Sequence, residues 1–239
     1  EICACLVGSE MCIRDRNGVV RMLRKIVVRV FIIEGVGAIL LCIRFIPEMG
    51  ILKGTYYGIF HSISAFCNAG FDVLGTADNQ FASMTTYACN PVINITLMLL
   101  IVIGGIGFVT WEDIKNNKYH FKRYKMQSKL IIVTTAVLIT VPAIIFMIND
   151  MMTGSEKMPV FKALFQSVTL RTAGFNTVDL NAMKQASVMI MIVLMLIGGS
   201  PGSTAGGMKT TTFAVLMGNM VATFKRNKNC LLYTSPSPR

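Results

Sequence analysis

Two short glycine-containing segments stand at matching positions in the chain and could bind a cation through their backbone. Phe60-His-Ser-Ile-Ser64 leads to Ala69-Gly-Phe71, and Phe165-Gln-Ser-Val-Thr169 leads to Ala173-Gly-Phe175, with a difference of one residue in spacing. Glycine frees the backbone and brings no side chain, so carbonyl oxygens can replace water around a dehydrated cation. One Ala-Gly-Phe would be explained equally well by a helix C-cap. Two copies favour cation binding.

A glycine-rich segment, Gly198–Lys209, is the second feature that could carry chemistry. Its five glycines and Pro201 predict a break in any helix. The segment also lies one inserted residue, Met208, away from the phosphate-binding consensus G-x-x-x-x-G-K-[ST]. A phosphate loop follows a short strand in a soluble α/β unit, whereas this segment follows an apolar run at Ala186–Ile197. Nucleotide binding is therefore the less favoured alternative.

The elements that must position these segments are membrane-spanning helices. The chain of 239 residues is 53% hydrophobic and only 15% charged, with a mean hydropathy of +0.59. A soluble domain carries about 25% charged residues. A helix needs about 20 apolar residues to cross a membrane, and four runs meet that need. We predict an all-α integral membrane protein with spans at Ile26–Ile46, Pro91–Trp111, Leu130–Ile148 and Ala186–Met208.

Two further apolar segments, Thr55–Phe66 and Pro159–Leu170, are too short to cross. Because each lies between two spans and leads into an Ala-Gly-Phe, we predict re-entrant helices that end at membrane depth. Irregular backbone there is tolerated only where it is buried in protein or lines a water-filled cavity. The C-terminal end of each short helix adds a negative potential that favours a cation.

Charge placement predicts the orientation. Basic residues cluster at Arg21–Lys25, Lys115–Lys129 and Lys225–Lys228, whereas the connections Pro47–Asn90 and Asn149–Lys184 carry more acids. The positive-inside rule places the basic blocks in the cytoplasm. Because the net charge of +11 sits in blocks between uncharged runs, and not on a continuous basic face, we exclude nucleic-acid binding. In the first span, Glu34 is expected to face protein.

The two ends, residues 1–16 and 230–239, resemble translated adapter sequence and are expected to be non-native. The cysteines between them, Cys42, Cys67 and Cys89, have no metal-binding spacing. The chain contains no Ser/His/Asp set, no carboxylate pair within a span and no thiol–histidine pair. We therefore predict neither an enzyme nor a bound cofactor.

Three stretches, Ser64–Phe71, Thr169–Thr177 and Gly198–Thr211, resemble the Trk/Ktr/HKT superfamily of potassium transporters, and most closely the bacterial Ktr-type membrane subunit. The resemblance covers about residues 17–229. It implies four span–pore helix–span repeats with pseudo-fourfold symmetry around one pore. Residues 17–114 would be the second repeat, 115–128 a cytoplasmic loop, and 129–229 the third repeat.

The resemblance also implies roles for single residues. Glycine at both matched turn positions is similar to the potassium-selective members. Lys209 would either repel cations from within a gate or snorkel at the end of a span, and Arg171 is expected to neutralise a neighbouring acid. The implied filter carbonyls are those of Asn68, Ala69, Gly70, Phe71, Thr172, Ala173, Gly174 and Phe175. The implied gate loop consists of Gly198, Gly199, Ser200, Pro201, Gly202, Ser203, Thr204, Ala205, Gly206, Gly207 and Lys209.

The function that the resemblance implies is potassium uptake across the cytoplasmic membrane, down the electrochemical gradient or coupled to sodium or protons. The implied partners are membrane lipid, a second copy of the full-length subunit and a cytosolic nucleotide-binding regulatory subunit. A large cation needs about six to eight oxygen ligands, so two turns are not expected to transport alone. The alternative is a non-conducting membrane scaffold, in which glycines such as Gly104 and Gly105 are helix-packing sites.

Overall fold

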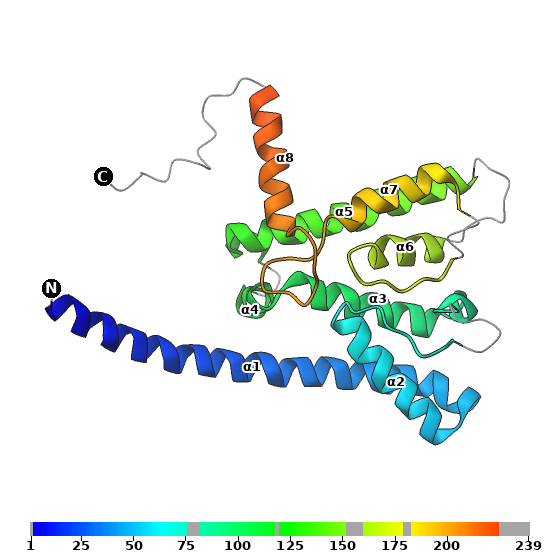
Figure 1. Ribbon diagram of the computed structural model, residues 1–239, viewed down its shortest axis with the longest axis horizontal. Helices are drawn as coiled ribbons and strands as arrows, with labels where there is room; N and C mark the ends of the chain where they lie inside the picture. Colours follow the sequence, from blue (N-terminus) through cyan, green and yellow to red (C-terminus); the bar gives the residue numbers. More distant parts are fainter. Residues whose placement is uncertain (1, 76–81, 118–119, 152–159, 179–182, 225–239) are drawn as a thin grey trace. The chain divides into compact units, whose positions relative to one another are not determined.

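The computed structural model describes residues 2–75, 82–117, 120–151, 160–178 and 183–224, with side chains from Val20 onward (Figure 1). Within these ranges the chain is helical, and the only β-type pairing is an isolated bridge between Ile197 and Met208. The predicted all-α class is confirmed. The helices are α1 (Ile2–Met49), α2 (Ile51–Phe66), α3 (Pro91–Ile106), α4 (Phe108–Asn117), α5 (Met126–Met151), α6 (Val160–Thr169), α7 (Gln185–Met195) and α8 (Thr210–Phe224), with 3-10 turns at Thr85–Tyr87 and Phe121–Arg123.

The chain forms two compact units, residues 1–63 and 64–239, and the boundary falls within α2. In the first unit, Gly50 (φ 83°) separates α1 from α2. A Cβ on Gly54 would lie 2.6 Å from the Cα of Ile46, and one on Gly58 would overlap the sulfur of Cys42. These two glycines therefore allow α2 to pack directly on the backbone of α1.

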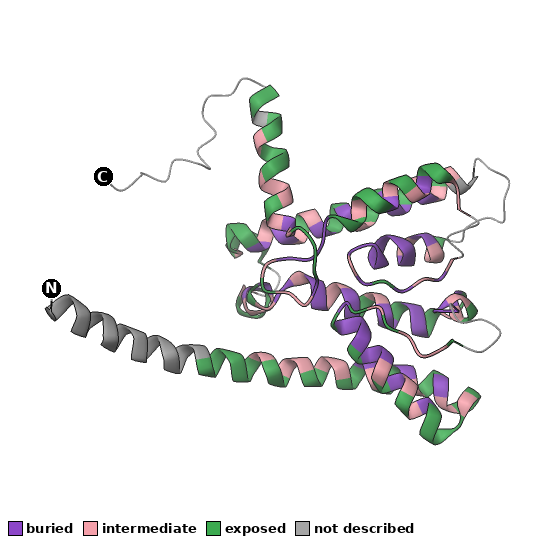
Figure 2. Ribbon diagram, viewed as in Figure 1, coloured by how far each residue is buried: buried purple, intermediate pink, exposed green. Residues whose placement is uncertain are grey.

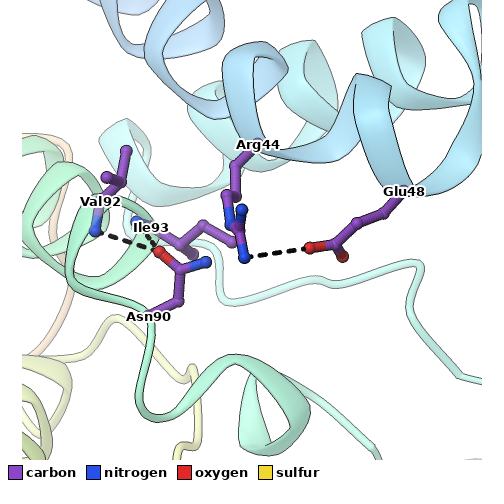
Figure 3. A network of polar contacts seen from close by, with 5 residues as sticks. All are labelled: Arg44, Glu48, Asn90, Val92 and Ile93. Atoms are coloured by element: carbon purple, nitrogen blue, oxygen red, sulfur yellow. Dashed lines mark hydrogen bonds and ion pairs between the residues drawn. The ribbon is translucent and has the colours of Figure 1, made fainter.

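α1 contains the predicted span Ile26–Ile46 and is longer at both ends. It includes residues 2–16, whose non-native origin stays a prediction. Glu34 was expected to face protein. In this structure its side chain is only half-buried by the described residues. Arg44 and Glu48 form an exposed i,i+4 ion pair with an N–O distance of 3.4 Å (Figure 3).

In the second unit, α3 begins at a well-defined cap. The Oδ1 atom of Asn90 accepts from the backbone N–H of Val92 (3.2 Å) and of Ile93 (3.5 Å), and Pro91 occupies the first turn (Figure 3). An asparagine cap followed by proline is a favoured helix start, because the first amides have no partner within the helix.

The predicted span Pro91–Trp111 was wrong as a single straight helix. α3 ends at Ile106, Gly107 takes φ 94°, and α4 continues at an angle of 96° to α3. The indole N–H of Trp111 donates back to the carbonyl of Ile103 (3.0 Å). The bend is stable because the last carbonyls of α3 receive hydrogen bonds from outside the helix.

α5 extends the predicted span Leu130–Ile148 at both ends and contains Pro142. A proline donates no amide hydrogen bond, which leaves the carbonyl of Leu138, four residues earlier, without its helical partner. The hydroxyl of Ser167 on α6 donates to the carbonyl of Ile139 (2.6 Å) and lies 3.4 Å from that of Leu138. The backbone just before Pro142 thereby becomes the attachment point for α6.

The second short helix is the centre of the second unit. α6 packs against α5 and α3 (Figure 1), and Figure 2 shows it mostly buried, whereas α8 is mostly exposed. Phe146, Ala163, Leu170 and Met191, from α5, α6 and α7 and the turn after α6, form the core cluster. Both predicted short helices are thus present as α2 and α6, although Pro159 lies outside the described residues.

The fourth predicted span, Ala186–Met208, is interrupted in the glycine-rich segment where the sequence predicted a helix break. α7 ends at Met195, residues 196–209 form a loop, and α8 begins at Thr210. This break agrees with the helix-breaking content of Gly198–Lys209. By length and composition Val20–Met49 and Met126–Asn149 can each cross a membrane, and the bent pair α3 and α4 could form a third crossing. α7 and α8 are each too short, and α8 was not predicted.

Several residues used to predict the orientation lie outside the described residues. They are Asp78, Lys118, Glu156, Asp179, Lys225, Arg226 and Lys228, and the predicted non-native end at 230–239 lies there too. Lys122 and Arg123, from the central basic block, are exposed.

Candidate functional site

The two Ala-Gly-Phe motifs form turns of the same shape, here called the first glycine turn (residues 67–71) and the second glycine turn (residues 171–175). Asn68 and Thr172, each two residues before the glycine, have φ values of 52° and 65°, and Gly70 and Gly174 have φ values of 70° and 92°. Non-glycine residues rarely adopt positive φ. Matching rare conformations therefore relate the two turns more closely than their sequences do.

The hydrogen bonds that close the turns match as well. Ser64 Oγ, near the end of α2, donates to the carbonyl of Phe71 (2.7 Å), and Thr169 Oγ1, at the end of α6, donates to the carbonyl of Phe175 (2.6 Å). A second pair of hydroxyl side chains also makes matching hydrogen bonds. Ser62 and Ser167 each donate to a backbone carbonyl 28 residues earlier. Hydroxyl groups at equivalent positions of the two short helices thus donate equivalent hydrogen bonds to backbone carbonyls.

Most backbone carbonyls of the two turns accept no hydrogen bond from the described residues. The amides of Ala69 and Ala173 donate to the helix-end carbonyls of Ser64 and Thr169, at 2.9 Å each. The carbonyls of Phe71 and Phe175 each accept a hydroxyl hydrogen bond. In the described part of the chain, no hydrogen bond uses the backbone carbonyls of Asn68, Ala69, Gly70, Thr172, Ala173 or Gly174 as acceptors.

The glycine turns lie against each other. A Cβ on Gly70 would overlap the carbonyl oxygen of Ala173 and lie 2.8 Å from the Cα of Gly174, and a Cβ on Gly174 would lie 3.2 Å from the Cα of Gly70. A side chain at position 70 would therefore prevent this backbone contact, and one at position 174 would crowd it. The aromatic neighbours differ, because Phe175 is fully buried whereas Phe71 is 70% exposed.

The glycine-rich loop (residues 196–209) is closed by its own hydrogen bonds. The amide of Gly198 donates to the carbonyl of Met208 (2.9 Å), and the amide of Met208 donates to that of Leu196 (3.0 Å). A Cβ on Gly198 would overlap the carbonyl of Gly206. Ser203 Oγ donates to the carbonyl of Ser200 within the loop (2.5 Å). The loop therefore has a defined conformation.

The same loop caps the C-terminal end of α3. The amides of Ser200 and Thr204 donate to the carbonyls of Gly105 (2.9 Å) and Gly104 (3.3 Å), and the amide of Phe108 donates to the carbonyl of Gly202 (2.9 Å). Helix-end carbonyls have no partner within the helix. The loop supplies those partners at the bend where α3 ends.

The loop also contacts both glycine turns. Thr204 Oγ1 donates to the carbonyl of Phe66 (2.8 Å) and accepts from Asn68 Nδ2 (3.1 Å). A Cβ on Gly207 would lie 3.3 Å from the Cγ2 of Thr172. The structure therefore brings together the three segments that were singled out in the sequence. The contacts of the Asn68 and Thr204 side chains were not predicted, because they join residues distant in sequence.

Two basic residues near these segments have different surroundings. Lys209 Nζ donates to the carbonyl of Ala205 (2.9 Å), so its amine is held within the loop. Arg171 is 5% exposed, and its Nε and Nη2 atoms have no hydrogen-bond partner among the described residues. A Cβ on Gly105 would lie 3.9 Å from that Nη2, near the C-terminal end of α3, where the helix dipole favours a cation. The acid expected beside Arg171 is not found in the described part of the chain.

Comparison with known proteins places these features in a family context. Residues 14–231 match the family described as TrkH, cation transport protein. The chain is 38% identical over 219 residues to the potassium/sodium uptake protein NtpJ of Enterococcus hirae, covering 89% of this chain and 47% of that protein. It is 37% identical over 205 residues to the Ktr system potassium uptake protein B of Vibrio alginolyticus, covering 82% and 43%.

The fold is similar to that of the potassium transporter TrkH from Vibrio parahaemolyticus. The TM-score is 0.60 at 23% sequence identity, and the match covers 80% of this chain and 39% of that one. The chain thus spans less than half the length of each of these three proteins.

Proposed function

Because the chain belongs to the TrkH family of cation transport proteins, we propose that it is part of a longer potassium uptake protein and supplies two quarters of that protein's selectivity filter. Members of this family are multi-pass integral membrane proteins and transporters, not enzymes. The observation that carries the proposal is the direct contact of two glycine turns in which the carbonyls of the three residues before each phenylalanine accept no hydrogen bond in the described part of the chain.

These carbonyls would act as ion ligands. A dehydrated potassium ion needs oxygen atoms that replace its hydration shell without strong competing hydrogen bonds. α2 and α6 both end at a glycine turn, so the negative ends of their dipoles add to the attraction for a cation. About six to eight ligands are needed for a large cation. The remaining ligands would come from two further repeats outside this chain, arranged with pseudo-fourfold symmetry.

The glycine-rich loop would act as the gate. It contacts both glycine turns and the end of α3, so its displacement would alter the surroundings of the filter without unfolding a helix. Its internal hydrogen bonds give it one defined position, and its glycines permit another. The amine of Lys209, which is bound to the carbonyl of Ala205, would move with the loop.

The partners and energetics follow from the same assignment. The relative from Vibrio alginolyticus bears the name of a Ktr system, and a multi-component system of that kind would combine two membrane subunits with a cytosolic nucleotide-binding regulatory subunit. Uptake would run inward across the cell membrane, with sodium as a possible coupling ion. No further cofactor is proposed for this chain.

Uptake of rubidium, a potassium substitute, tests the proposal. The full-length protein is expected to restore uptake in cells that lack potassium uptake systems, whereas this chain alone is not. Gly174→Ser in the full-length protein is expected to lower rubidium uptake and to raise sodium uptake relative to it, because a side chain at φ 92° disturbs the contact with Gly70. Gly218→Ser on α8 is the matched control, since apart from the adjacent backbone of its own helix nothing in the described part of the chain lies within 4 Å of a Cβ there. Unchanged uptake of both ions by the Gly174 variant would refute a filter role for this turn, and a full-length protein without uptake would favour a non-conducting scaffold.

A further inference from the structure

The side chain of Asn68 contains a buried oxygen without a hydrogen-bond donor. Asn68 is 8% exposed, and its Nδ2 group donates to Thr204 Oγ1 (3.1 Å) and lies 3.4 Å from the carbonyl of Phe66. Its Oδ1 atom has no partner among the described residues. Buried amide oxygens are nearly always hydrogen-bonded, so an unpartnered one beside a glycine turn calls for a ligand that can occupy it.

The hydroxyl of Thr204 determines which end of the amide points toward the loop. A threonine hydroxyl has one proton to donate, and Thr204 gives it to the carbonyl of Phe66 (2.8 Å). Toward Asn68 the hydroxyl can therefore act only as an acceptor. It selects the NH2 end of the amide, and Oδ1 is left on the side away from Thr204.

We propose that Thr204 is a positioning residue that orients the Asn68 amide so that Oδ1 becomes a side-chain ligand for a dehydrated monovalent cation. This inference depends on the proposed filter. It adds to the backbone carbonyls an oxygen from a side chain, and it makes that oxygen depend on the glycine-rich loop. When the loop is in place the oxygen is available, and when the loop is displaced the amide is free to rotate.

The matching position in the second turn supports the assignment. Thr172 shares the positive φ of Asn68, and its Oγ1 atom also has no hydrogen-bond partner among the described residues. The two turns touch through Gly70 and Gly174. Side-chain oxygens thus precede the Ala-Gly-Phe motif by one residue in both turns. A hydroxyl rotates freely and needs no orienting partner, whereas an amide does, which explains why only the Asn68 turn needs Thr204.

Rubidium uptake by the full-length protein in cells tests this role, with the membrane content of each variant measured by immunoblot. Thr204→Val keeps the shape of the side chain but removes both hydrogen bonds. It is expected to raise the KM for rubidium about five- to tenfold, the effect of one hydrogen bond of ordinary strength, while the maximal rate per molecule changes little. Thr204→Ser keeps the hydroxyl and is expected to restore the wild-type KM. Thr140→Val, which removes an exposed hydroxyl that donates only to the carbonyl of Ala136 within α5, is the matched control.

A double variant separates orientation from simple packing. Asn68→Thr places at position 68 the residue found at the matching position 172, and a hydroxyl there needs no orientation. In that background Thr204→Val is expected to change the KM by less than about twofold, because the coupling between the two residues has been removed.

The results that overturn the inference differ from those that overturn the proposed function. A wild-type protein without rubidium uptake refutes the proposed function and this inference with it. Normal wild-type uptake together with an unchanged KM in Thr204→Val, or an equal KM increase in both the Asn68 and Asn68→Thr backgrounds, refutes the positioning role alone. If the Thr204→Val protein does not accumulate, rubidium-dependent thermal stabilisation of the purified Asn68→Leu variant decides: stabilisation equal to that of wild type refutes the ligand role.

Discussion

Gly104 and Gly105 are neighbours in the last turn of α3, and we expect alanine to have opposite effects at the two positions. A Cβ on Gly104 would overlap the carbonyl oxygen of Phe66 and lie 2.9 Å from Thr204 Oγ1. A Cβ on Gly105 would find only Arg171 Nη2, at 3.9 Å, which is ordinary contact. The site at Gly104 is therefore closed by the end of α2 and the glycine-rich loop, and the site at Gly105 is open.

The difference in stability between the two variants can be estimated, because the gain in helix propensity is nearly the same in both and largely cancels. Replacing glycine by alanine within a helix stabilises by about 0.8–1.0 kcal/mol, and less near a helix end. Forcing a methyl group into a filled site costs about 1–3 kcal/mol. Gly105→Ala should therefore be neutral or slightly stabilising, and Gly104→Ala should be less stable than Gly105→Ala by about 1–3 kcal/mol.

Thermal stability of the full-length protein in detergent, together with rubidium uptake, checks this expectation. Gly104→Ala is expected to lower both, because relief of the overlap requires the loop or the end of α2 to move. Gly105→Ala is expected to leave both near their wild-type values. The packing argument fails if the two variants lose stability and uptake equally, or if Gly104→Ala behaves like wild type.

Three further expectations can be measured independently. Gly70→Ala should reduce rubidium uptake more than Gly174→Ala, because the new methyl group overlaps the Ala173 carbonyl in the first case but is 3.2 Å from its nearest neighbour in the second; equal losses would contradict this. A carboxylate oxygen of Asp113 accepts from the backbone N–H of Lys125 (2.9 Å) and connects α4 to the start of α5. Asp113→Asn should therefore lower the stability of the protein by about 1–3 kcal/mol, with little effect on uptake per folded molecule. In single-cysteine variants, exposed Cys89 should react with an impermeant maleimide in intact cells, and Lys122→Cys should react only after permeabilisation; the reverse pattern would invert the proposed topology.

Hydroxyl side chains are a common feature of the proposed gate and filter and of the helices around them. They donate hydrogen bonds to backbone carbonyls that have no amide partner at turns and before proline. Ser167 donates to a carbonyl just before Pro142, and Thr169 closes the second glycine turn. Thr204 serves the carbonyl of Phe66 at the end of α2. Inside a membrane no water is available for this purpose, so short hydroxyl side chains make irregular backbone possible there.

The amino-acid sequence by itself determined the features that depend on local composition. Low charge and long apolar runs indicated an all-α membrane protein, and the short segments at Thr55–Phe66 and Pro159–Leu170 formed helices where they were expected, within the described residues. The glycine content of Gly198–Lys209 predicted a break in the helix. Motif resemblance indicated the family. Each of these predictions depends on residue propensity or spacing within one stretch of chain. That information is present in the sequence without knowledge of distant contacts.

Only the tertiary structure decided the features that depend on contacts between distant residues. The bend at Gly107 follows from carbonyls of α3 that are capped by residues near position 200, and one apolar stretch thereby becomes two helices. α8 begins where the glycine-rich loop is closed by its own hydrogen bonds. The contact of Gly70 with Gly174 and the bond between Asn68 and Thr204 join segments about a hundred residues apart or more. Their existence depends on packing in three dimensions, which local propensity does not encode.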